Sequence, residues 1–269
     1  KFAAGTTSGI TQPNITPTAG KTWSLNFSEE FTGTTVDLNK WTTCFSWAWD
    51  YANCTYSFNN GKEDYRSSQV RYSNGTAKLV AEPSGSKYIS GLLSTTNKPN
   101  SLTGGVQGPS LYKFKYGYVE ARLKLPPQKG FFSAFWLLPT STAASGYSYP
   151  YEVDILENLG GGDTPLFQTI HYAGRGTSWS PYPSGNCSPS VDPFTGFHTY
   201  GVDWQASYLD FYIDGKKCGR FTSEVWSGDM EIILNLMVDV QWQSAYPSLY
   251  GATGTGTLEA DYVRVWQQQ

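Results

Sequence analysis

The chain has 269 residues, which is enough for one large all-β domain or two small ones. Its net charge of −3 and its lack of any Lys and Arg run argue against nucleic acid and anionic membrane surfaces as partners. No apolar stretch approaches the ~18 residues of a membrane-spanning helix. Aromatic residues reach 16%, which suits either contact with sugar rings or a large β-sandwich core.

The chain opens with a segment rich in Thr, Pro, Gly and Ala, and we interpret residues 1–20 as a flexible leader or the end of an interdomain linker. No later break marks a second boundary, so we predict a single domain over residues 21–269. Short strand-like runs separated by turn residues follow one another in it, and helical periodicity is confined to a turn or two near residues 223–226. The pattern predicts an all-β fold, an antiparallel β-sandwich with long loops. The expected strands cover residues 23–27, 69–72, 77–81, 116–125, 131–138, 167–172, 198–204, 208–213, 231–237 and 258–266.

Four cysteines fall into two sets, and neither spacing matches a C-x-x-C metal or redox motif. An even count in a chain rich in Thr, Ser, Asn and Gly suggests a secreted protein with two disulfides. Three pairings exist; we favour Cys44–Cys54 and Cys187–Cys218 because each closes a local loop. Buried free thiols are the alternative.

The segment Glu152-Val-Asp-Ile-Leu-Glu157 places three carboxylates within six residues that otherwise resemble a buried strand. Neighbouring like charges in apolar surroundings raise one another's pKa, which costs stability but separates the pKa values that an acid/base pair needs. A solvated edge strand or a calcium site is the alternative. The apolar spacers argue against a metal loop, which favours Gly, Asn and oxygen-rich spacers.

The spacing of these carboxylates predicts a bulge. In a regular strand Glu152 and Asp154 share a face, whereas Glu157 is one residue out of phase. A single β-bulge between Asp154 and Glu157 brings all three onto one face, and such bulges are common beside active sites. Two carboxylates about 5–5.5 Å apart can cleave a glycosidic bond with retention, provided that the strand curves enough to bring them together.

These six residues resemble the E-x-D-x-x-E signature of glycoside hydrolase family sixteen, in its bulge-containing, laminarinase-like branch. The resemblance continues in order along most of the chain, at residues 26–31, 38–41, 116–126, 134–139, 197–204, 211–215 and 261–265. It implies a concanavalin-like β-jelly-roll with a concave cleft, and hydrolysis of internal β-glycosidic bonds with retention. By position, Glu152 is then the nucleophile, Asp154 its helper and Glu157 the acid/base, and no cofactor is required for the chemistry.

Other positions are candidates for substrate binding. His171 matches a family position beside the acid/base, although a lone His on a strand is also a common core or surface residue. Trp136 suits the core as well as it suits a sugar platform, and Trp242 is expected in a loop, where stacking on sugar explains it. Gln168 should alternate away from His171. The polar stretch at Asn59, and Tyr149 and Tyr151 before the first carboxylate, complete the candidate set.

The resemblance also implies a structural Ca²⁺, because Asp261 and the backbone near Gly75 match positions that hold this ion in many family members. From the sequence alone Asp261 is simply an acidic residue of a strand.

The leading hypothesis is a secreted, monomeric endo-β-glucanase whose partner is a β-1,3 or mixed β-1,3/1,4 glucan. An agarase-like or carrageenase-like enzyme is a rival, but it needs basic residues for sulfated galactans, and the segments named above hold few. Transglycosylation is a further outcome of the same site. A glucan-binding lectin is the rival from another class; such relatives typically lose a catalytic carboxylate, and this chain keeps three.

Overall fold

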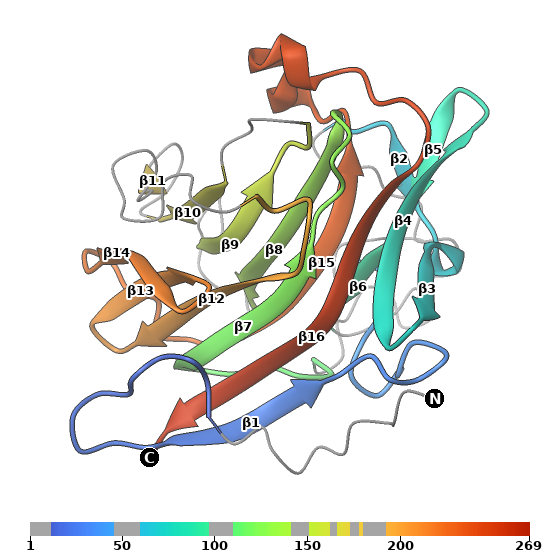
Figure 1. The fold of residues 1–269 in the computed structure, drawn as a ribbon. Helices are drawn as coiled ribbons and strands as arrows, with labels where there is room; N and C mark the ends of the chain where they lie inside the picture. Colours follow the sequence, from blue (N-terminus) through green and yellow to red (C-terminus); the bar gives the residue numbers. More distant parts are fainter. Residues whose placement is uncertain are drawn as a thin grey trace, which may run out of the picture.

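Two β-sheets packed face to face form the structure, a computed structural model that describes residues 12–45, 60–96, 110–140, 151–161, 166–172, 178–179 and 192–269 (Figure 1). All strand pairs are antiparallel except that of two short strands near one edge. The predicted all-β sandwich is therefore confirmed. Within these ranges no helix is both long and apolar enough to cross a membrane.

The larger sheet has ten strands. They are β1 (Trp23–Glu29), β2 (Glu63–Tyr65), β3 (Val70–Ser73), β4 (Thr76–Ser84), β5 (Lys87–Ser90), β7 (Gly117–Lys124), β12 (His198–Gln205), β13 (Tyr208–Ile213), β14 (Lys216–Phe221) and β16 (Gly256–Gln268). Their order is β14-β13-β12-β7-β16-β4-β5-β2, with β1 also paired to β16 and β3 to β4.

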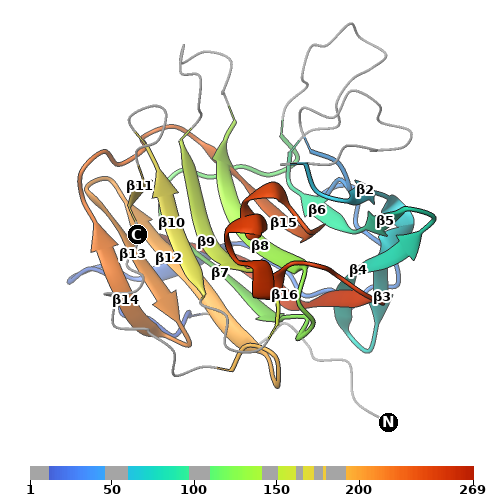
Figure 2. The same ribbon diagram turned by 90° about the horizontal axis from the view of Figure 1, so that it is seen from above.

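The smaller sheet has six strands and carries the carboxylate segment. They are β6 (Leu92–Ser94), β8 (Phe131–Pro139), β9 (Glu152–Asn158), β10 (Phe167–His171), β11 (Ser178–Trp179) and β15 (Met230–Val238). Their order is β11-β10-β9-β8-β15-β6, so β9 lies between β8 and β10 (Figure 2).

The main core lies between the sheets, and β8 shows how the sequence produces it. Phe135 and Leu137 join the inter-sheet cluster with Val119 of β7. Phe132 and Trp136, one residue out of step, belong to a second apolar cluster on the outer face of the six-stranded sheet. Both faces of β8 are thus covered, which explains its nearly continuous apolar sequence.

The outer face of the ten-stranded sheet carries an aromatic cluster formed by Trp23, Tyr118 and Trp266. Part of the expected leader packs against it: Ile15 contacts the cluster, and its carbonyl accepts a hydrogen bond from Trp23 Nε1 at 3.2 Å. The described part of residues 1–20 is therefore held on the sheet.

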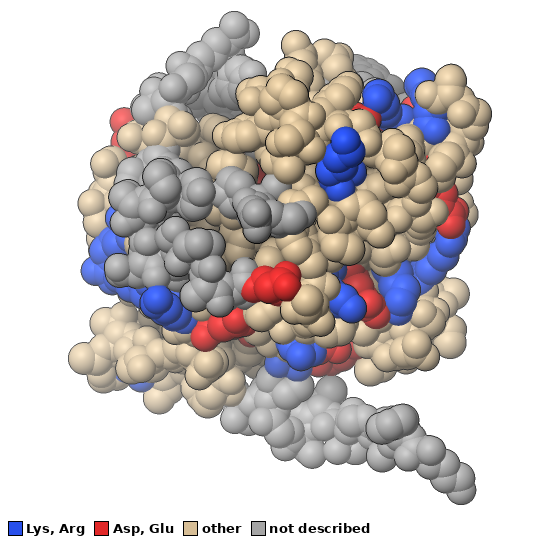
Figure 3. All heavy atoms as spheres, turned by 45° about the horizontal axis from the view of Figure 1, so that its top comes forward, with Lys and Arg blue, Asp and Glu red and all other residues tan. Residues whose placement is uncertain are grey.

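Helical structure in the described part of the chain is limited to short 3-10 turns, η1 (Ser67–Gln69), η3 (Gln241–Ala245) and η4 (Pro247–Leu249). The turn expected near residues 223–226 does not form a helix. Charged side chains of both signs are interspersed over the surface shown in Figure 3, in keeping with ion pairs such as Arg71–Glu82.

Cys44 and Cys218 both take part in disulfide bonds. Cys54 and Cys187 lie outside the described residues, so the pairings Cys44–Cys54 and Cys187–Cys218 stay predictions.

Candidate active site

The predicted bulge is present in β9. On β8, the consecutive residues Phe135 and Trp136 pair with Leu156 and Asp154, so Ile155 is an extra residue in β9. The pairing of β9 with β10 shifts over the same stretch. An unpaired extra residue lets the strand change phase without ending, which is what the spacing of the carboxylates demanded.

The bulge turns two consecutive apolar residues inward and brings the carboxylates together on the opposite face. Ile155 and Leu156 are both fully buried in the inter-sheet core. Glu157 therefore lies on the same outer face as Asp154 and Glu152. All three carboxylates thus project from one side of a single strand.

Gln168 of β10 contributes a contact to the bulge that sequence reasoning missed. Its side chain is 3% exposed, and its Nε2 donates a hydrogen bond to the carbonyl of Ile155 at 3.2 Å. The sequence correctly placed Gln168 on the face opposite His171. No local signal indicated its contact with the carbonyl of the extra residue.

The carboxylates repel one another in a buried setting. Burial, followed by the charge of Asp154, raises the pKa of Glu157 well above its ordinary value. Burial and then the charges of Asp154 and Glu157 raise the pKa of Glu152 in the same direction. Among the described residues no Lys or Arg forms an ion pair with any of the three, so nothing cationic of that kind offsets the repulsion.

His171 is the exception to this lack of cationic partners. It lies opposite Glu152 in the β9–β10 pairing, and its Nε2 is 3.2 Å from Oδ2 of Asp154. Contact with this carboxylate raises the pKa of His171, although burial acts against the shift. One ligand atom each from Glu152, Asp154 and His171 lie within 4.8 Å of one another, so this set also has the donors of a divalent metal site.

The structure places Tyr151, a candidate for substrate binding, in the core. This residue is 9% exposed and packs in the inter-sheet core, stacked on Trp226 with ring centroids 5.7 Å apart. Because Glu152 points to the outer face, its neighbour Tyr151 must point inward.

Trp136 lies on the same face as the carboxylates, opposite Asp154, but it is only 4% exposed. Its Nε1 donates a hydrogen bond to Oδ1 of Asn235 at 2.8 Å, and its ring packs near Phe45. This burial favours the core interpretation for this residue. Its buried ring supports the face from which the carboxylates project, and offers little surface for stacking on sugar.

Asn235 belongs to a buried polar network behind Trp136 that the sequence did not reveal. Its Nδ2 donates to the hydroxyl of Tyr65 at 3.1 Å, and both residues are fully buried. Glu63, also fully buried, accepts a hydrogen bond from the backbone of Val238 at 2.8 Å. The one available signal was Asn235, which stands within the apolar end of the β15 sequence.

The remaining substrate candidates are Trp242, Asn59 and Tyr149. Trp242 belongs to η3 and not to an irregular loop. Asn60 donates a hydrogen bond to Gln241 at 2.7 Å, which joins the stretch after Asn59 to this 3-10 turn. Asn59 and Tyr149 lie outside the described residues, and their roles stay predictions.

The residues proposed for calcium fit this ion poorly. Oδ2 of Asp261 is 2.6 Å from Nη1 of Arg122, so the carboxylate already has a cationic partner. Gly75 has φ +76 in the tight turn between β3 and β4, where its conformation serves the turn itself. We therefore derive no role for a metal here.

Known proteins of one family are similar to this chain. The sequence profile of "Glycosyl hydrolases family 16" matches residues 60–264. Glucan endo-1,3-beta-glucosidase A1 of Niallia circulans is 25% identical over 276 residues, covering 91% of this chain and 38% of that protein. The kappa-carrageenase of Pseudoalteromonas carrageenovora is 28% identical, covering 92% of this chain and 65% of that protein.

Among solved structures, the endo-beta-1,3-glucanase of Pyrococcus furiosus superposes with a TM-score of 0.71 at 26% identity, over 96% of this chain and 99% of that chain. This chain spans only 30% to 38% of the length of the first curated relatives that it matches.

Proposed function

This chain belongs to family 16 of the glycosyl hydrolases, and on that premise we propose that it is an endo-acting, retaining glucanase that cleaves β-1,3 or mixed β-1,3/1,4 glucans. The observation that carries the proposal is the bulge in β9, which sets Glu152, Asp154 and Glu157 on one face without Lys or Arg partners in the described part of the chain. Carboxylates held this way are suited to proton transfer and to nucleophilic attack.

In the first step Glu152 attacks the anomeric carbon, and the bond from that carbon to the leaving oxygen breaks. Glu157, whose raised pKa keeps a proton available, gives that proton to the leaving oxygen. In the second step Glu157 accepts a proton from water, the water oxygen attacks the anomeric carbon, and the bond to Glu152 breaks. The anomeric configuration is thereby retained.

Asp154 and His171 prepare Glu152 for this work. Burial and the neighbouring charges raise the pKa of Glu152, yet the nucleophile must be ionised. A protonated His171 beside Asp154 places a positive charge next to the cluster, which favours negative charge on the carboxylates. Both are positioning residues, since they act through Glu152.

The charge of the sheet favours a neutral glucan over a sulfated galactan. None of the six strands of the smaller sheet contains Lys or Arg; they are β6, β8, β9, β10, β11 and β15. A sulfated chain would meet carboxylates here without compensating cations. The disulfide bonds of Cys44 and Cys218 support secretion, because disulfides persist in oxidising compartments.

Incubation with laminarin and with barley glucan tests the proposal, with reducing ends and the anomeric configuration of the first product followed by NMR. We expect β-anomeric products first, and a loss of at least about 10³-fold in Glu152→Gln. Glu82→Gln is the matched control, since it removes a carboxylate that pairs with Arg71 at the surface. Inactivity on both glucans, α-anomeric first products or an active Glu152→Gln variant contradicts the proposal. Binding without turnover would identify a lectin.

A further inference from the structure

Within the described ranges, one group of three side chains has the composition of a metal site, and it includes the proposed nucleophile. Glu152 and Asp154 of β9 and His171 of β10 each offer one ligand atom, and these three atoms lie within 4.8 Å of one another. Glu152 and His171 lie opposite each other in the β9–β10 pairing, so the register of two neighbouring strands fixes their positions. Ligands carried by strands are held more precisely than ligands carried by loops.

Asp154 contributes a buried oxygen without a hydrogen-bond donor. The residue is 3% exposed, and no group in the described part of the chain donates a hydrogen bond to its Oδ2. Nε2 of His171 is 3.2 Å from this oxygen, but the two atoms are not aligned for a hydrogen bond. Buried polar groups nearly always have partners, so this oxygen calls for one. The side chain of His171 is 42% exposed, which gives an ion from solvent a route to the pair.

The separation of these two atoms fits two ligands of one ion. Zn²⁺ binds imidazole nitrogen and carboxylate oxygen at about 2.0–2.1 Å, so two such ligands of a tetrahedral ion lie about 3.3 Å apart. The long side chain of Glu152 can rotate to complete the set. The mixture of nitrogen and oxygen donors favours Zn²⁺ over Mg²⁺ and Ca²⁺, which bind through oxygen.

The charge of this face also favours a cation. Glu157 adds a further carboxylate beside the group, and its charge acts on Glu152. None of the strands of the six-stranded sheet contains Lys or Arg. A divalent ion would therefore offset the repulsion among the carboxylates, with no positive side chain of these strands opposing its approach.

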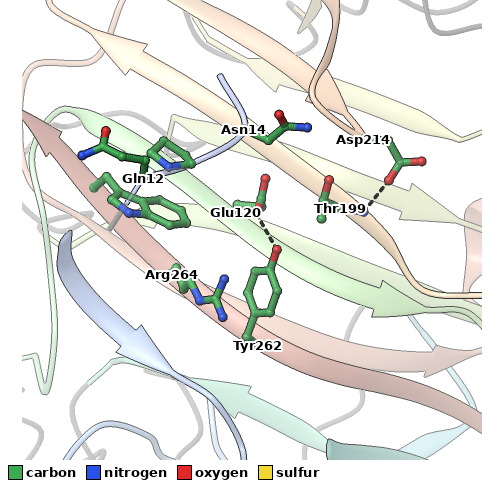
Figure 4. Close-up of a pocket in the computed structure, with 9 residues that line it drawn as sticks. Gln12, Asn14, Glu120, Thr199, Asp214, Tyr262 and Arg264 are labelled. Atoms are coloured by element: carbon green, nitrogen blue, oxygen red, sulfur yellow. Dashed lines mark hydrogen bonds between the residues drawn. The ribbon is translucent and has the colours of Figure 1, made fainter. Parts of the chain in front are cut away.

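The other histidine of the chain provides an internal comparison. Nδ1 of His198 is 2.7 Å from Oδ2 of Asp214, and Oδ1 of Asp214 accepts a hydrogen bond from the backbone N–H of Thr199 at 2.8 Å (Figure 4). Both oxygens of this carboxylate thus have partners. No third ligand residue joins His198 and Asp214 in the part of the chain that the structure describes.

We propose that Glu152, Asp154 and His171 bind a Zn²⁺ ion that reversibly inhibits the enzyme. The ion would occupy the carboxylate of Glu152, which could then no longer attack the anomeric carbon. It would also engage the imidazole of His171 and so remove its positive charge from beside Asp154. The inhibition rests on the proposed function, whereas the binding of the ion does not.

NMR of the histidine ring protons during titration with ZnCl₂ tests the site directly, because the chain has only two histidines. We expect a saturable change in the signal of His171, which His171→Gln identifies by its disappearance, and an unchanged signal of His198. MgCl₂ at the same concentrations should leave both signals in place. Hydrolysis of laminarin should fall with the same half-saturation concentration of Zn²⁺ and recover when EDTA is added.

Two substitutions probe the ligands. Glu152→Gln and His171→Gln each remove one of them, and each should weaken Zn²⁺ binding at least about 10-fold in calorimetric titration, since loss of residues that merely support metal ligands already has effects of this size. His198→Gln is the matched control, because it removes the other histidine from the opposite sheet. Its affinity for Zn²⁺ and its turnover of glucan should equal those of wild type.

The absence of a saturable change at His171, a change at His198 instead, or equally tight binding of Mg²⁺ would overturn the site. Binding of Zn²⁺ at His171 without loss of hydrolysis would overturn the inhibition. The wild-type titration does not depend on the folding of any variant. Inactivity on both glucans would contradict the proposed function and the inhibition with it, while the titration still decides whether the ion binds.

Discussion

Two Arg-paired carboxylates on the outer face of the ten-stranded sheet contrast with the carboxylate cluster on the outer face of the six-stranded sheet. On the ten-stranded sheet, Asp210 pairs with Arg220 and Glu30 with Arg264. Burial acts to raise the pKa of Glu30, but the hydrogen bonds and charge of Arg264 hold it below the usual value. On the six-stranded sheet the pKa values of Glu152 and Glu157 are both raised. Paired carboxylates stabilise the fold, whereas unpaired ones reduce stability and are available for chemistry.

Glu157→Gln tests the claim that the unpaired carboxylates are available for chemistry, and it should give the largest effect. Activity on β-glucans should fall by at least about 10³-fold, because the proton donor is lost. The free energy of unfolding at neutral pH should rise, since a group whose folded pKa is raised destabilises the protein once it ionises. Initial rates and urea denaturation at pH 7 measure both. A variant that is inactive and also less stable would show that Glu157 belongs with the structural carboxylates.

Asp210→Asn tests the claim that the paired carboxylates stabilise the fold. Asp210 is 2% exposed and is bonded to Arg220 at 2.6 Å through both oxygens and to Lys217 at 2.8 Å. The variant should lose about 1–3 kcal/mol of unfolding free energy, between the values for exposed and buried pairs, because Arg220 and Lys217 are themselves partly exposed. Urea denaturation measures the loss, and glucan hydrolysis by the folded variant should match wild type. Reduced activity at full stability would refute the assignment.

His171 combines features of the two sheets. It contacts a carboxylate, as Arg220 and Arg264 do, but this carboxylate, Asp154, belongs to the cluster without Lys or Arg partners. The folded pKa of His171 is raised above 6.5 by Asp154, so its stabilising contact is fully present below pH 6.5 and is lost as the pH rises through the raised value. His171→Gln should therefore lose stability mainly at the acidic end of this window. It should also lower kcat about 10-fold and shift the pH profile of kcat/KM.

The measurements for His171 are urea denaturation and glucan hydrolysis from pH 5 to pH 9, with wild type as the reference. A uniform loss of stability at every pH, with an unchanged pH–rate profile, would mean that His171 acts only through packing.

The shared face of the carboxylates could be predicted from the sequence, because it depends only on the two-residue period of a strand. Glu157 is out of phase with Asp154, and a bulge is the local way to correct this. The same period argues against a cleft position for Tyr151, because this residue precedes Glu152 and therefore points to the core. Its place directly before the first carboxylate made it a candidate, but alternation decides which face it reaches.

Trp136 and Asn235 show where a local pattern stops being informative. Both faces of β8 are buried, so alternation does not distinguish core from cleft for Trp136. Its orientation depends on Asn235, which is distant in the sequence and adjacent only after β15 pairs with β8. Contacts of this kind follow from strand order, which short-range patterns do not contain. The short strands β2, β5 and β6 were missed for a similar reason, since pairing defines them more than composition does.

Gln168→Met should give the smallest effect. It tests whether Gln168 supports the core or the geometry of the carboxylates. The substitution keeps the volume and removes the hydrogen bond from Nε2 to the carbonyl of Ile155. Stability should fall by about 1 kcal/mol, the typical value for such a bond. If this bond also fixes the bulge, kcat should fall several-fold more than KM changes, because the spacing between Glu152 and Glu157 loosens. Thr169→Val, at the neighbouring position of β10, is the matched control. Equal changes in the two variants, or a loss of stability with kcat intact, would show that Gln168 supports the core and not the geometry of the carboxylates.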